Sequence, residues 1–230
     1  PPADADTLAY HFALPKLFLQ SEKLVFVPRA ADGAIPLLTQ MTFLPVLALG
    51  GEMSLTLWAG LTGLITSGFF FFVSRKFFSG YWSALIVLLI MTTPAVVFGA
   101  GTGQVEYRMA LFTLGSIFAC LRAIETGSIK FVVLSALLAG FAVGTKFTGL
   151  IIALATILVL LVRSRNLKWT VLFVAVSTLA GGQWYFWNWL NTGDPIFPML
   201  FNLLDYRDPA IWDQVHQLEF QKMFASEQIL

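Results

Sequence analysis

The sequence predicts an all-α fold, a polytopic bundle of transmembrane helices. Of its 230 residues, 57% are hydrophobic and only 12% are charged, whereas soluble domains carry about 25% charged residues. Several apolar runs approach or exceed the ~20 residues that a helix needs to span a bilayer. The net charge is only +1, so the composition gives no indication of a nucleic-acid partner.

The spans follow from the apolar runs. Four runs each predict one helix across the membrane: 53–73, 81–100, 107–123 and 169–190. A fifth run, 131–162, is too long for one ordinary span and contains Lys146. It is either a single overlong helix or a hairpin of two short helices with Lys146 at the turn.

The distribution of basic residues favours the hairpin, because basic residues concentrate in cytoplasmic loops. If residues 1–52 lie outside and 131–162 forms a hairpin, the inner loops contain Arg75, Lys76, Arg122, Lys130, Arg163, Arg165 and Lys168. A single long helix would leave the last three outside. Each half of the hairpin is short and must therefore tilt or thin the bilayer locally.

Three regions are expected along the chain. Residues 1–52 form an outer loop with juxtamembrane helices over 7–28 and 35–49. Residues 53–190 form the bundle, with about six spans. Residues 191–230 form a second outer loop, with a short amphipathic helix over 211–218, that could close as a lid. Because the chain opens on polar PPADAD without an initiator Met, we expect it to be part of a longer polytopic protein.

This topology gathers scattered charges on, or close to, one membrane face. They are Asp4, Asp6, Glu106, Arg108, Lys146 and Asp194. Ionisable groups are costly near a bilayer, so such a cluster is a functional-site hypothesis by default. Carboxylates together with cations suit chemistry on a phosphate-linked substrate.

The acidic pair Asp4 and Asp6 has two interpretations. An ionised carboxylate beside an acceptor nucleophile is a general base, and two carboxylates could hold a divalent cation, Mg²⁺ or Mn²⁺. Alternatively, both are solvated loop residues, or Asp6 caps the helix that follows.

Three charges at the ends of spans are the next candidates. Glu106 could bind a metal or an acceptor, or act as a base, and Arg108 could hold a phosphate through its planar guanidinium; alternatively, the two form an ion pair. Lys146 is costly among apolar helices unless a phosphate lies nearby, or unless it extends to the lipid headgroups.

The remaining polar candidates are weaker. His11, next to Tyr10, either contacts substrate or packs in the interface. Asp194 most simply forms a turn with Pro195. Cys120 lies within an apolar run, as expected of an inert buried thiol. His216 and His11 are far apart in sequence, so they do not indicate a zinc site.

Four motifs in this order resemble the GT-C glycosyltransferases, in the branch of the protein O-mannosyltransferases and the lipid A aminoarabinose transferase. They are Asp6-Thr-Leu-Ala-Tyr10-His11, IPLLTQMTFLPVLALGG, LAGFAVGTKFTGL and QWYFWNWLNTGDPIFP. The chain departs from the family at Trp187, where an Arg is frequent.

The resemblance implies a GT-C type bundle with juxtamembrane helices in the first outer loop. It implies transfer of a sugar from a polyprenyl-phosphate carrier to a lipid, glycan or protein acceptor on the extracytoplasmic face of the membrane, expected to be a bacterial plasma membrane. Asp6 resembles the catalytic carboxylate, Glu106 the second acidic site residue and Lys146 a ligand of the carrier phosphate, with Asp4 as helper. Direct displacement would invert the anomeric carbon.

Two other functions use the same residues differently. A transporter or flippase for an anionic lipid or solute would bind through these charges without chemistry. A scaffold subunit of an envelope complex would tolerate their neutral substitution.

Overall fold

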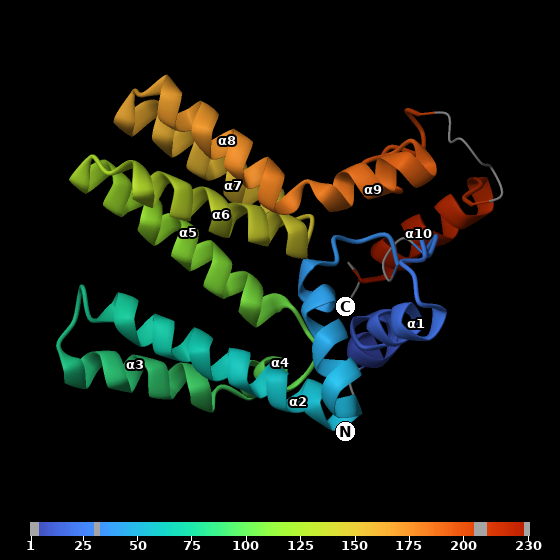
Figure 1. Cartoon of the computed structure of the whole chain (residues 1–230), viewed down its shortest axis with the longest axis horizontal. Helices are drawn as coiled ribbons and strands as arrows, with labels where there is room; N and C mark the ends of the chain where they lie inside the picture. Colours follow the sequence, from blue (N-terminus) through green and yellow to red (C-terminus); the bar gives the residue numbers. More distant parts are fainter. Residues whose placement is uncertain (1–4, 30–32, 205–210, 228–230) are drawn as a thin grey trace.

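The chain folds into helices (Figure 1), most of which are joined by short turns; longer connections precede α2 and follow α9. The computed structural model describes residues 5–29, 33–204 and 211–227, and within these ranges it contains no strand. This confirms the all-α prediction. The helices are η1 (Thr7–His11), α1 (Ala13–Ser21), α2 (Leu38–Ser74), α3 (Gly80–Thr92), α4 (Pro94–Gly101), α5 (Glu106–Thr126), α6 (Ile129–Thr145), α7 (Gly149–Val159), η2 (Leu160–Ser164), α8 (Leu167–Gly181), α9 (Gln183–Thr192) and α10 (Gln214–Glu227).

The long helices run back and forth between two ends of a bundle (Figure 1). The turns that follow α2, α5 and η2 lie at one end, which we call the basic end because the inner-loop cations listed above lie in or beside them. The α4–α5 loop and the α6–α7 turn lie at the other end, beside α1. We call this the α1 end.

Within the described ranges, α2 and α5 are each long and apolar enough to cross a membrane. The pair α3 and α4 also qualifies, although it is bent by 74°. The run 131–162 is two helices, α6 and α7, separated at 146–148, and not one overlong helix. Like α8, they are short apolar helices.

Proline and glycine break two helices that we predicted as continuous. The 81–100 span breaks because Thr93 is extended ahead of Pro94, where proline disfavours the helical conformation of the preceding residue. The 169–190 span divides into α8 and α9 at Gly181–Gly182, where two poor helix formers adjoin.

Helix bounds in the outer regions also differ from the prediction. The helix predicted over 7–28 ends at Ser21, and residues 23–29 form neither helix nor strand. The helix predicted over 211–218 begins later and runs longer, as α10. Apolar periodicity alone marked the presence of both helices but not where each ends.

The predicted helix over 35–49 and the predicted span over 53–73 correspond to the two halves of α2, which a non-helical bend separates. The bend lies at Gly51, whose φ of 66° and ψ of −166° only glycine adopts readily. The Ser54 hydroxyl donates hydrogen bonds to the carbonyls of Val46 (2.7 Å) and Gly51 (2.5 Å). These bonds satisfy backbone acceptors that the bend removes from the helical pattern.

Small residues allow the helices at the centre of the bundle to approach closely. Helix α6 packs against α5, α7 and α8, and where it crosses α8 the backbones of Gly140 and Gly181 are in contact. A methyl group on either glycine would overlap the backbone of the other helix. Membrane helices commonly associate in this way, because packing replaces the hydrophobic effect as the driving force.

The bend of α2 generates a stability prediction. Gly51→Ala should lower stability by about 1–3 kcal/mol, the cost of a strained backbone position, even though a Cβ there would meet no atom within 4 Å. Thermal unfolding of the detergent-solubilised protein measures this. The control is Gly60→Ala in the regular part of the same helix, where a Cβ also meets nothing within 4 Å; it should be neutral or stabilising by up to about 1 kcal/mol. Equal behaviour of the two variants would contradict a strained bend.

Candidate functional site

An ion pair joins two helix ends at the α1 end of the bundle. Glu106 is the first residue of α5, and Lys146 is the extended residue that ends α6. The Lys146 ammonium donates to a Glu106 carboxylate oxygen at 2.7 Å, with both side chains about half exposed. The pair therefore neutralises Lys146 in this structure, and at such exposure it adds little to stability.

Arg108 is directed away from Glu106, so the Glu106–Arg108 ion pair considered above does not form. Side chains two positions apart on a helix do not face each other. The Arg108 guanidinium is buried, donating from Nε to the Thr62 hydroxyl (3.0 Å) and from Nη1 to the Gln104 carbonyl (2.6 Å). It lies 5.5 Å from the centre of the Phe43 ring.

The Arg108 charge is incompletely satisfied. Its Nη2 is buried without a hydrogen-bond partner, and no carboxylate in the described part of the chain pairs with it. The side chain lines a cavity of about 300 Å³ between α2, α5 and α6. The cavity is lined by Leu38, Thr39, Thr42, Trp58, Thr62, Arg108, Leu111, Phe112 and Phe141. Threonine hydroxyls and an uncompensated guanidinium form a pocket suited to an anion.

Helix η1 lies against the loop that precedes Glu106. The Thr7 hydroxyl accepts a hydrogen bond from the Gly103 backbone N–H at 3.0 Å, and Gly103 has no room for a side chain because Thr7, His11 and Phe12 pack against it. This contact brings η1 and the start of α5 together at the α1 end, although they are about a hundred residues apart.

Asp6 precedes η1 and is exposed. Its side chain makes no capping hydrogen bond, so the helix-cap alternative does not describe it. Asp4 lies outside the described residues. Within them, no group of three or more His, Cys, Asp or Glu side chains is placed to hold a metal ion.

His11 and Tyr10 are packed into the protein. His11 is buried, and its Nδ1 lies 2.8 Å from the amide nitrogen of Gln40 on α2. Tyr10 is half-buried beside Leu14 and Leu37. The packed-histidine alternative therefore describes His11.

The three remaining candidates, Asp194, His216 and Cys120, have structural surroundings. Asp194 is fully buried, and its carboxylate accepts from the backbone N–H groups of Ile196 (2.8 Å) and Leu200 (2.9 Å), which fixes the predicted turn. His216 donates its backbone N–H to Asp213 at the start of α10, and this bond, together with one from the His216 ring, lowers the pKa of the Asp213 carboxyl. Cys120 is buried among apolar side chains.

Sequence reasoning missed the polar partners of these groups. Gln40 and Thr39 are polar residues within an apolar run, a signal that was available, and they contact His11 and Thr145. Thr62 is a single hydroxyl in a predicted span, and nothing in the sequence marks it as a partner of Arg108.

A protein-family model matches the part of the chain that forms most of the helices described above. Residues 38–181, from α2 to α8, match the family model described as dolichyl-phosphate-mannose-protein mannosyltransferase. The match includes Glu106, Arg108 and Lys146, and begins after Asp6 and His11. No curated protein and no solved structure is detectably similar to the chain. Since the model covers more than half of the chain, the protein belongs to the dolichyl-phosphate-mannose-protein mannosyltransferase family and is an integral membrane glycosyltransferase.

Proposed function

We propose that this protein transfers a sugar from a polyprenyl-phosphate carrier to an acceptor at the α1 end of the bundle. The family takes its name from a mannose donor of this kind, so mannose is the first sugar to test. The α1 end would face away from the cytoplasm, because the loop cations gather at the opposite end and basic loops are cytoplasmic. A bacterial plasma membrane is the proposed location.

The observation that carries the proposal is the buried guanidinium of Arg108. A buried charge without a counter-ion costs several kcal/mol, and a phosphate oxygen at Nη2 would offset that cost. Lys146 is a weaker candidate, because it already has Glu106 as partner at 2.7 Å. We therefore assign the carrier phosphate chiefly to Arg108, with Lys146 as a second cation that can leave Glu106 when the donor binds.

The reaction we propose is a single displacement. Asp6 takes the proton from an acceptor hydroxyl or amine as that atom forms a bond to the anomeric carbon. The bond from the anomeric carbon to the phosphate oxygen breaks, and its electron pair leaves on the lipid phosphate. The Arg108 guanidinium stabilises that charge, an electrostatic contribution that is commonly the largest in catalysis. Attack opposite the leaving group inverts the anomeric carbon.

Asp6→Asn tests the proposed base. The change keeps the size of the side chain but removes its basicity, so transfer should fall about 10²–10⁴-fold while binding of the donor is retained. The assay is turnover of a radiolabelled polyprenyl-phosphate sugar by the whole protein in nanodiscs. Glu22→Gln, which neutralises another exposed carboxylate of the N-terminal segment, is the control and should leave turnover unchanged. Wild-type turnover in Asp6→Asn would exclude Asp6 as the base.

Arg108→Met tests the phosphate site. The substitution removes charge-assisted hydrogen bonds worth about 1.5–3 kcal/mol, so binding of polyprenyl phosphate should weaken roughly 10–100-fold. Binding is measured by the increase in melting temperature that the lipid produces. The empty protein should be no less stable, because the substitution removes an uncompensated charge. The control is Arg122→Met at the other end of α5, where the arginine is exposed and paired with Glu125. Unchanged lipid binding in Arg108→Met would refute this assignment.

The same assay ranks the two cations. Lys146→Met should weaken polyprenyl-phosphate binding less than Arg108→Met does, because binding through Lys146 requires the loss of its ion pair with Glu106. A larger loss in Lys146→Met would reverse the ranking and make Lys146 the principal phosphate ligand.

A further inference from the structure

The Lys146–Glu106 ion pair joins the same two helices that wall the Arg108 cavity. Phe112 of α5 and Phe141 of α6 both line this cavity, and their ring centres are 5.6 Å apart. Glu106 begins α5 and Lys146 ends α6, so the pair connects these helices at the α1 end. The ion pair is therefore next to the proposed phosphate site.

Helix α2 shows how close Lys146 is to Arg108. Thr39 and Phe43 lie one turn apart on the same face of α2, about 6 Å along the helix axis. The Thr39 hydroxyl is 3.3 Å from that of Thr145, the residue before Lys146. The Phe43 ring lies 5.5 Å from the Arg108 guanidinium. Because lysine has a flexible four-carbon stem, its ammonium can reach a phosphate that is bound at Arg108.

A phosphate at Arg108 would compete with Glu106 for the Lys146 ammonium. The present pair is about half exposed, and exposed pairs are held weakly. Charge-assisted hydrogen bonds to phosphate are among the stronger ones. A phosphate and a carboxylate on one ammonium would also repel each other. Lys146 therefore exchanges its partner when the donor binds.

The carboxylate that Lys146 leaves remains in a favourable position. Glu106 is in the first turn of α5, where the helix dipole stabilises a negative charge. It also lies near the proposed base: Thr7, which follows Asp6, accepts a hydrogen bond from Gly103, three residues before Glu106. Two carboxylates thus flank the contact between η1 and the α4–α5 loop.

We propose that binding of the donor releases Glu106 from Lys146, and that the freed carboxylate accepts a hydrogen bond from the hydroxyl or amine of the acceptor. The inference rests on the proposed function and adds an order to it. In the empty protein Lys146 occupies Glu106, so the acceptor binds productively only after the donor.

Chemical modification of carboxylates tests the release without requiring transfer. The whole protein in nanodiscs is treated with a water-soluble carbodiimide and an amine, and modification of each carboxylate is measured by mass spectrometry. Saturating polyprenyl-phosphate mannose is then added without acceptor. Modification of Glu106 should increase up to about fivefold, the factor that corresponds to ~1 kcal/mol for an exposed ion pair. The increase in melting temperature shows that the donor is bound.

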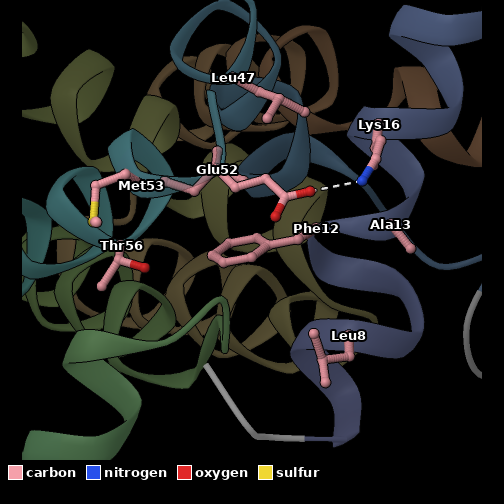
Figure 2. Close-up of a pocket in the computed structure, with 9 residues that line it drawn as sticks. Leu8, Phe12, Ala13, Lys16, Leu47, Glu52, Met53 and Thr56 are labelled. Carbon is pink, nitrogen blue, oxygen red and sulfur yellow. Dashed lines mark hydrogen bonds and ion pairs between the residues drawn. The ribbon is translucent and has the colours of Figure 1, made fainter. Parts of the chain in front are cut away.

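Two other ion pairs provide controls within the same sample. Glu125 is paired with Arg122 at 2.8 Å and is exposed to nearly the same extent as Glu106, but it lies at the basic end. Glu52 is paired with Lys16 at 2.6 Å at the α1 end (Figure 2). Modification of both should stay unchanged when the donor binds. An equal increase at Glu125 would indicate general loosening, and an increase at Glu52 alone would place the phosphate at Lys16; either result would overturn the proposal.

Lys146→Met gives the reference for a released carboxylate. Glu106 in this variant should be modified without donor as strongly as in the wild type with donor, and adding donor should raise it no further. If Glu106 in the empty wild type already reacted as fast as in Lys146→Met, the pair would not protect it and the proposal would fail. The wild-type comparison stands alone if the variant does not fold.

The remaining results separate this inference from the proposed function. A higher melting temperature with unchanged or lower modification of Glu106 would mean that the pair persists or that the donor covers the carboxylate. The order of binding would then be wrong, whereas the phosphate site at Arg108 would stand. No change in melting temperature would mean that the donor does not bind, and both proposals would fail.

Discussion

The bend of α2 at Gly51 separates two sets of contacts that this helix makes at the α1 end. Residues before the bend contact the N-terminal helices and α6: Gln40 bonds His11, and Thr39 lies 3.3 Å from the Thr145 hydroxyl. Residues after it reach α5, where Thr62 accepts from Arg108. A cavity of about 480 Å³ beside α1 is lined by Leu47 before the bend and by Glu52, Met53, Leu55 and Thr56 after it. A backbone conformation that glycine adopts readily therefore lies within the wall of this cavity.

We propose a different ranking of the two cations from the one that the sequence favoured. Lys146 is the more conspicuous in sequence, since it interrupts an apolar run, but its charge is half exposed and paired. Arg108 sits at a span boundary and attracts less attention, but it is buried and its charge is uncompensated. Exposed ion pairs contribute at most about 1 kcal/mol, whereas an uncompensated buried charge costs several. The larger effect is the reason why we propose Arg108 as the principal ligand of the anion.

Apolar run length and the helix-breaking residues predicted much of the fold. The run 107–123 corresponds to α5, and the turn at Lys146 separates α6 from α7. What failed were two junctions: Pro94 and Gly182 break helices that hydropathy reads as continuous. The predicted separation of 35–49 from 53–73 is present, because Gly51 interrupts the helical conformation within α2. Hydropathy averages over a window, whereas these outcomes depend on the conformation of one or two residues.

The candidate site was predictable as a face of the membrane but not as a set of contacts. Topology alone put Glu106 and Lys146 on one side, but their pairing joins residues 40 positions apart. The rule that helix neighbours two apart do not face each other could have excluded the Glu106–Arg108 pair from the sequence. The docking of η1 on Gly103 depends on tertiary packing, and no local pattern indicates it.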